Sequence, residues 1–282
     1  MGNALFIVWR ESVEAILIVG ILYAWIRERG GDRIGLRHLW IGVAAGVGLA
    51  ALLAVAMLSV QTQLAGTALE AFQAAIVFAA TALITHMVLW MRRHGRQMKR
   101  ELEAELQRAA TGTGGPAAAV LAAVAVGREG SETVLFLYGL GLERRGVELV
   151  SLLGGAALGF LLALLTAWLI AKGRKIVSWR AFFRATEILL LLLAASLMTG
   201  GVEKLISLEW VPPIVEPLWN TSAVLDDGSI AGSLVAAFTG YRARPSLALV
   251  LAYLTYWAVV SLLIARANRV PGHGPSAIER VG

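Results

Sequence analysis

The chain has 282 residues, of which 58% are hydrophobic and 16% are charged. This composition is too apolar for an ordinary soluble domain and indicates an integral membrane protein. The sequence contains no cysteine, which excludes disulfides, thiolate metal sites and iron–sulfur clusters, so we expect any metal ligand to be oxygen or imidazole. The net charge of +6 comes from basic residues between apolar segments, which points to membrane topology and not to a nucleic-acid partner.

Seven apolar segments long enough to cross a bilayer as helices follow one another along the chain. Their approximate ranges are 4–26, 39–60, 68–91, 116–142, 149–171, 181–203 and 246–265. Long apolar runs separated by short basic stretches favour helices over the ten-residue alternating strands of a barrel. We therefore predict an all-α integral membrane protein with seven transmembrane helices in one membrane domain over residues 1–282.

Lysine and arginine are distributed unevenly between the two sides of this predicted membrane domain. Eighteen of them lie in the connections and tail on one side and five lie on the other. The positive-inside rule then places the N-terminus outside and the C-terminus in the cytoplasm. The longest cytoplasmic connection is 92–115, and the longest outer connection is 204–245.

The pattern R-E-x-x-E occurs once in the first segment and once in the fourth. It is formed by Arg10, Glu11 and Glu14, and by Arg128, Glu129 and Glu132. A charged side chain at bilayer depth is costly, so such residues usually face a bundle interior and mark an ion or substrate path. On a helix, glutamates three residues apart share a face, and the arginine pairs with the glutamate four residues on.

The charges of the two motifs favour a multivalent cation. Four carboxylates and two guanidinium groups leave a formal charge of −2 in a low-dielectric interior, where unpaired charge is expensive. Carboxylate oxygens are hard ligands that suit Fe(III), Mn(II), Mg(II) or Ca(II). Two such motifs at corresponding depths therefore predict a single cation site.

The interval between the motifs also recurs elsewhere in the chain, which indicates an internal repeat. The motifs are 118 residues apart, and the Gly42-x-x-x-Gly46 and Gly155-x-x-x-Gly159 patterns are 113 apart. Residues 4–91 and 116–203 are then two copies of three segments, followed by a seventh helix over 246–265. Because three spans is an odd number, the copies run in opposite directions, and a substrate site is expected near the midplane between them.

Other ionisable residues are weaker candidates for the same path. Four lie in the third and sixth segments at repeat-related positions: Glu70, Glu187, His86 and Glu203. Four more lie in the long outer connection, where they form a candidate acidic mouth that concentrates cations: Glu209, Glu216, Asp226 and Asp227.

At these residues the sequence resembles the iron permease family, which joins fungal high-affinity ferric permeases to bacterial EfeU-type iron uptake permeases. The resemblance covers essentially the whole chain and includes the run from Gly240 to Ser246. It implies import of iron, expected as Fe3+, with the four motif glutamates as the metal-handling carboxylates and the two motif arginines as their partners. It further implies a bacterial cytoplasmic (inner) membrane location, no tightly bound cofactor, and periplasmic iron-binding and oxidase or peroxidase partner proteins.

Three alternatives to iron import remain open. The chain could carry another divalent metal such as lead or manganese, or it could be a proton-coupled carrier of an organic cation that uses the carboxylates as a relay. A haem-containing membrane reductase is a third, although haem normally needs pairs of intramembrane histidines and only His86 lies within a predicted segment.

Overall fold

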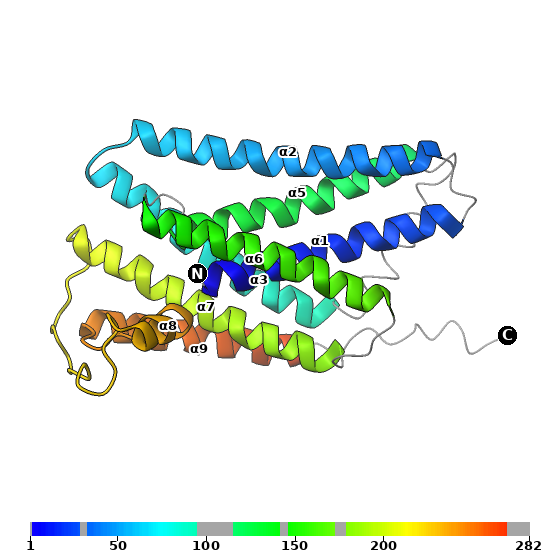
Figure 1. The fold of residues 1–282 in the computed structure, drawn as a ribbon. Helices are drawn as coiled ribbons and strands as arrows, with labels where there is room; N and C mark the ends of the chain where they lie inside the picture. The colour runs from blue at the N-terminus through cyan, green and yellow to red at the C-terminus, as the bar shows by residue number, and fades with distance from the viewer. Residues whose placement is uncertain (1, 29–32, 95–114, 142–145, 173–178, 270–282) are drawn as a thin grey trace.

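The computed structural model describes residues 2–28, 33–94, 115–141, 146–172 and 179–269, and in these ranges it is helical without strands (Figure 1). The helices are α1 (Gly2–Glu28), α2 (Arg33–Gln63), α3 (Thr67–His94), α5 (Gly115–Gly139), α6 (Val147–Ala171), α7 (Trp179–Ser207), α8 (Ile230–Thr239) and α9 (Leu247–Arg269). The predicted all-α class is confirmed. Most of the 92–115 connection lies outside the described residues.

Five of the described helices are long and apolar enough to cross a membrane. These spans are Gly35–Gln63, Thr67–Arg92, Val147–Ala171, Arg184–Ser207 and Leu247–Arg266. The chain is therefore a multi-pass membrane protein. Helices α1 and α5 have 27 and 25 residues, which corresponds to about 40 Å at 1.5 Å per residue and exceeds the ~30 Å hydrocarbon core. They differ from the five more apolar helices because each carries the three charged residues of one R-E-x-x-E motif.

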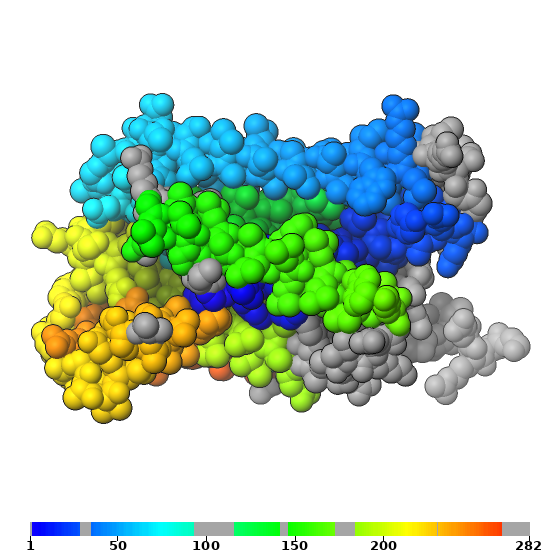
Figure 2. All heavy atoms as spheres, viewed as in Figure 1, coloured from blue at the N-terminus to red at the C-terminus, as the bar shows by residue number. Residues whose placement is uncertain are grey.

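The outward faces of α2 and α6 are apolar, as a lipid-facing surface requires. Leu52 on α2 is 67% exposed, and Leu161 on α6 is 60% exposed. In the space-filling view, α2 forms one edge of the molecule and α6 crosses the face turned toward the viewer (Figure 2). Such surfaces are expected to contact lipid hydrocarbon tails, because contact between apolar side chains and water is unfavourable.

The motif helices α1 and α5 lie inside the bundle and pack against helices from the other half of the chain. Helix α2 packs along α5, α1 packs along α6, and α3 packs along α7. The largest apolar core joins α1, α3, α5, α7 and α9, with Ile7, Ile84, Phe136 and Leu193 fully buried. This exchange of partners between halves brings the first and fourth predicted segments into the same interior.

Two close helix contacts recur at the interval between the motifs. A Cβ built on Gly46 of α2 would lie 2.9 Å from the Ala123 carbonyl oxygen and 2.7 Å from the Gly127 nitrogen of α5. A Cβ on Gly159 of α6 would lie 2.3 Å from the carbonyl oxygen of Leu5 and 3.0 Å from the nitrogen of Trp9 in α1. Residues 5 and 9 lie 118 positions before residues 123 and 127, so the two contacts are equivalent under the sequence repeat.

The outer connection is a folded segment and not a plain loop, which corrects the sequence-based description of 204–245. Helix α8 begins where the Ser229 side chain accepts a hydrogen bond from Gly232 N at 3.0 Å, and it ends at Gly240, whose φ of 74° suits glycine. Backbone hydrogen bonds from Leu218 to Pro245 and from Thr221 to Ala243 tie the segment together. In Figure 1, α8 lies beside the N-terminus of α1.

Candidate metal site

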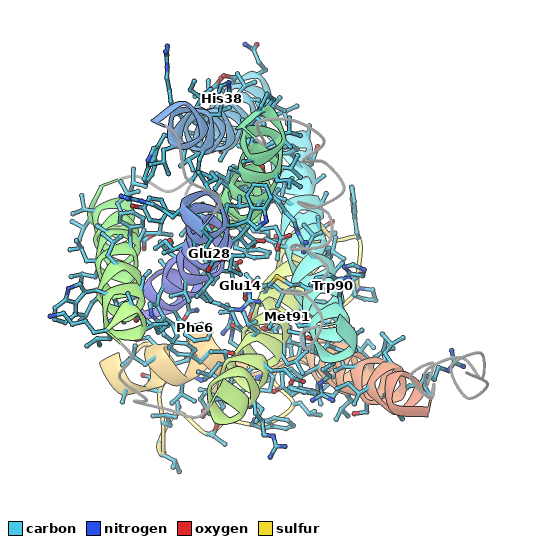
Figure 3. All side chains as sticks on the ribbon, turned by 90° about the vertical axis from the view of Figure 1, so that its right-hand side faces the viewer. Phe6, Glu14, Glu28, His38, Trp90 and Met91 are labelled. Carbon is cyan, nitrogen blue, oxygen red and sulfur yellow. The ribbon has the colours of Figure 1, made fainter. Side chains whose placement is uncertain are left out.

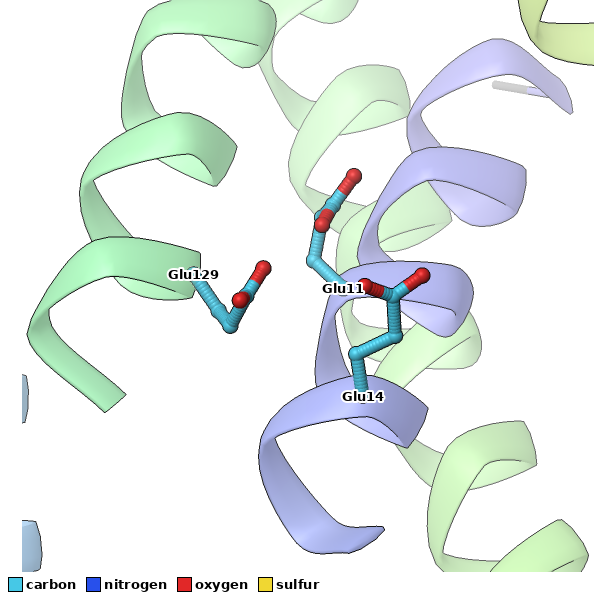
Figure 4. A group of neighbouring side chains, drawn as sticks. All are labelled: Glu11, Glu14 and Glu129. Atoms are coloured by element: carbon cyan, nitrogen blue, oxygen red, sulfur yellow. The ribbon is translucent and has the colours of Figure 1, made fainter. Parts of the chain in front are cut away.

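Three carboxylates from the two motifs meet between α1 and α5 (Figure 4). One oxygen from each of Glu11, Glu14 and Glu129 lies within 4.8 Å of the others, and we call this group the carboxylate cluster. Glu11 and Glu129 are 1% and 5% exposed. The prediction that the two motifs approach each other is therefore confirmed, although Glu132 does not belong to this closest group within the described residues.

The guanidinium group of Arg10 bridges the two glutamates of its own motif. Its Nη1 contacts Glu11 Oε1 at 2.6 Å, and its Nη2 contacts Glu14 Oε1 at 2.5 Å. The Arg10 side chain is 2% exposed, so the ion pair is shielded from water. Such a pair offsets the large desolvation cost of its charges only when the geometry is good and the remaining groups are satisfied.

The second motif has the same ion pair in a more open setting. Arg128 Nε contacts Glu132 Oε1 at 2.9 Å, and the Arg128 side chain is 45% exposed. The guanidinium lies 5.4 Å from the ring centroid of Trp90 on α3, within the range of a cation–π contact. The two motif arginines thus differ in burial, even though both belong to the same R-E-x-x-E pattern.

Several carboxylate oxygens at the site lack a hydrogen-bond donor. Among the described residues, Oε2 of Glu11, of Glu129 and of Glu132 is buried without a partner. A buried unpaired acceptor costs roughly 1–3 kcal/mol, and more when it is charged. The donor set of converging carboxylates fits a hard cation, which would satisfy these oxygens at once.

The weaker path candidates do not belong to the carboxylate cluster. Glu70 and His86 are on exposed positions of α3. Glu187 pairs with Arg92 at the end of α3, and Glu203 forms two hydrogen bonds with Arg242, at 2.5 and 2.7 Å. The structure therefore pairs two of these four residues with arginines outside the cluster and leaves the other two on exposed positions.

The outer acidic residues do not converge on one point in the described segment. Glu209, Glu216 and Asp226 are exposed, and Asp227 is half-buried, where its Oδ2 accepts from the backbone N–H of Ala243 at 3.4 Å. The hydrogen bonds from Arg242 to Glu203, together with the nearby carboxylate charge, raise the pKa of the Arg242 guanidinium despite its partial desolvation. This ion pair stabilises the folded outer segment against the end of α7.

Two methionines that no sequence motif marks also contact the site. Arg10 Nη1 lies 3.3 Å from the Met87 sulfur, and Arg10 Nη2 lies 2.9 Å from the Met91 sulfur. Both methionines are on α3, four residues apart, and so share a helix face. The spacing of four residues can be read from the sequence. The sequence does not indicate, however, which other helix an apolar helix face packs against.

Comparisons with known proteins agree on one family. The model of the iron permease FTR1 family matches residues 1–270. The chain is 30% identical to the ferrous iron permease EfeU of Escherichia coli O6:H1 (strain CFT073) over 253 residues, which is 89% of this chain and 90% of the relative. It is 30% identical to the protein of the same name from Shigella sonnei over 264 residues, 93% of each chain. The Yersinia pestis relative is 27% identical over 253 residues, 89% of this chain and 88% of that one. No solved structure matches. The chain belongs to the iron permease FTR1 family.

Proposed function

We propose that this permease imports iron into the cytoplasm through the carboxylate cluster between α1 and α5. The single observation that carries the proposal is the convergence of Glu11, Glu14 and Glu129 within 4.8 Å in the bundle interior. A cation path is the usual reason for such residues at bilayer depth. Iron is cargo here and not a resident cofactor, and the protein is expected to work without a tightly bound group.

The proposed topology has seven transmembrane helices in one domain, with α1 and α5 crossing the bilayer as well as the five more apolar helices. The equivalent glycine contacts support two inverted repeats, because in each contact a glycine of one half lies against the motif helix of the other half. The loop charges support an outer N-terminus in a bacterial inner membrane. The acidic mouth and partner proteins that deliver iron from the periplasm remain part of the proposal.

The two motif arginines are buried to different extents, which supports a site whose two sides are not equivalent. Arg10 is 2% exposed and Arg128 is 45% exposed. In the proposed topology Arg10 lies on the outer side of the cluster and Arg128 lies on its cytoplasmic side, so the two sides of the site have different environments. Movement of the repeats relative to each other would then exchange these environments and release the metal.

Uptake of radiolabelled iron into proteoliposomes tests the site. The variants Glu14→Gln, Glu129→Gln and Glu132→Gln each keep the side-chain volume and remove a negative charge, so we expect them to abolish uptake while still reaching the membrane. Glu28→Gln is the matched control, because Glu28 is an exposed residue near the end of α1. Normal uptake by the three site variants would contradict the proposed site.

The same liposomes separate the remaining alternatives. Carboxylate oxygens accept both oxidation states, the family resemblance implies Fe3+, and the relatives are named for ferrous iron. Comparing Fe2+ with Fe3+ under imposed pH gradients identifies the species carried. Stronger uptake of Mn2+ or Pb2+ than of iron would favour a permease for another metal, and uptake of an organic cation with proton counterflow would favour the carrier.

A further inference from the structure

The contacts of Arg10 join the carboxylate cluster to two sulfur atoms. Its Nη1 is shared between Glu11 Oε1 and the Met87 sulfur, and its Nη2 is shared between Glu14 Oε1 and the Met91 sulfur. Each thioether therefore lies one donor atom away from a motif carboxylate. Met87 is 3% exposed and Met91 is partly buried, so neither sulfur is a surface feature.

We propose that Met87 and Met91 form a thioether side of the iron site and make it select Fe2+ over Fe3+. The inference rests on the proposed function of the carboxylate cluster and names the oxidation state that it carries. Thioether sulfur is a soft ligand, whereas carboxylate oxygen is hard. A site that contains both carboxylate and thioether ligands binds the softer ferrous ion through both kinds of atom. The harder ferric ion gains little binding free energy from the sulfur atoms.

The binding step is an exchange of cations within the cluster. Arg10 occupies one oxygen of Glu11 and one of Glu14, the same two residues that offer ligand atoms to a metal. A divalent ion between these glutamates and Glu129 repels the guanidinium at short range in a low-dielectric interior. As the guanidinium withdraws, the atoms that surrounded it are two carboxylate oxygens and two sulfurs, which then face the metal.

The methionine side chains can follow this exchange. Methionine is unbranched and has three rotatable bonds, so its sulfur can move toward a metal without a shift of the helix backbone. Thioethers are also weak acceptors, so they hold the guanidinium less firmly than carbonyl or carboxylate groups would. Viewed end-on, Glu14 and Met91 lie close to the centre of the bundle, between α1 and α3 (Figure 3).

Uptake by a double variant tests the selectivity. Met87→Leu with Met91→Leu removes both sulfurs and keeps the volume, which cores usually tolerate. We expect its KM for Fe2+ to rise about tenfold or more, the scale of losing a group that tunes a metal site, with little change for Fe3+. Inhibition of Fe2+ uptake by Pb2+ should weaken in parallel. Met57→Leu is the control, because Met57 is a buried methionine of α2, 6% exposed.

X-ray absorption at the iron edge provides a second measurement that needs no variant. Purified wild-type protein loaded with Fe2+ should show a sulfur neighbour, and a shell of only oxygen or nitrogen would overturn the inference. An unchanged Fe2+ to Fe3+ ratio in the double variant would overturn it as well. If the glutamine variants of the cluster lose uptake while the leucine variant keeps wild-type selectivity, only the thioether inference fails. If the glutamine variants keep uptake, the proposed site itself fails.

Discussion

Substitution of Gly159 by alanine should displace the first motif helix. The added Cβ would lie 2.3 Å from the Leu5 carbonyl oxygen, which belongs to the backbone of α1 and cannot rotate away. Ordinary contact distance is about 3.5 Å, so α1 and α6 must separate by roughly 1 Å. Trp9 directly precedes Arg10, and the displacement therefore reaches the motif.

The expected loss has a structural and a functional part. Overpacking of this kind costs about 1–3 kcal/mol of unfolding free energy. A preorganised site tolerates about 0.5 Å of misplacement, so a shift of about 1 Å should also reduce iron uptake strongly. Thermal unfolding in detergent and radiolabelled uptake in liposomes measure the two parts separately.

Gly48→Ala is the matched control for this experiment. A Cβ at Gly48 of α2 would meet nothing within 4 Å. Alanine is also the better helix former by about 1 kcal/mol, so this variant should be at least as stable as the wild type. If Gly159→Ala unfolds at the same temperature and transports as well as Gly48→Ala, the close approach of α1 and α6 does not hold the motif in place.

Three further predictions use other contacts. Arg10→Ala should destabilise the protein by about 3–5 kcal/mol, because it leaves two buried carboxylates without their cation. Arg128→Ala should cost less, because the Arg128 side chain is 45% exposed and pairs with Glu132 alone; equal losses in thermal unfolding would contradict this account of burial. The pKa of Arg242 is raised in the folded protein, so its pair with Glu203 contributes stability below the ordinary arginine pKa and loses it only at higher pH. Glu203→Gln should therefore lower the unfolding temperature by the same small amount at pH 6 and at pH 9, and a loss that appears at only one of these values would refute it. The absorption spectrum of the purified protein should lack a Soret band, and the presence of one would favour the haem reductase.

The helices and the meeting of the motifs could be predicted because their signals are local or repeated. An apolar run long enough to span a bilayer predicts a helix whatever it packs against, and all seven predicted segments overlap helices of the structure. The recurrence of R-E-x-x-E at one interval in oppositely directed copies predicts that Glu14 and Glu129 can approach each other. Helix α8 was missed because ten residues between turns give a weak periodic signal, even though Ser229 and Gly240 mark its two ends.

The surroundings of the motif arginines could not be predicted, because they depend on contacts between distant segments. The Arg10 side chain and the Met87 sulfur are 77 residues apart in the sequence. The absence of cysteine limited the expected metal ligands to oxygen and imidazole, and this expectation left out thioether sulfur. Nothing in the repeat distinguishes Arg10 from Arg128, and yet one is buried and the other is half-exposed.

Helix α3 is the element that makes the two copies different. It supplies Met87 and Met91 to Arg10 and Trp90 to Arg128, so one helix contacts both arginines. The positions that correspond to these three residues lie 117 further on, at the end of α7 and directly after it, and among them Lys204 donates instead to Gln73 at 2.8 Å. Gly159 of α6 and Gly46 of α2 make equivalent close contacts with α1 and α5. Helix α3, in contrast, places two methionines against Arg10 of α1 and a tryptophan against Arg128 of α5. The paired motifs therefore account for the carboxylates of the cluster, and the selectivity that we propose for it depends on a helix outside the motifs.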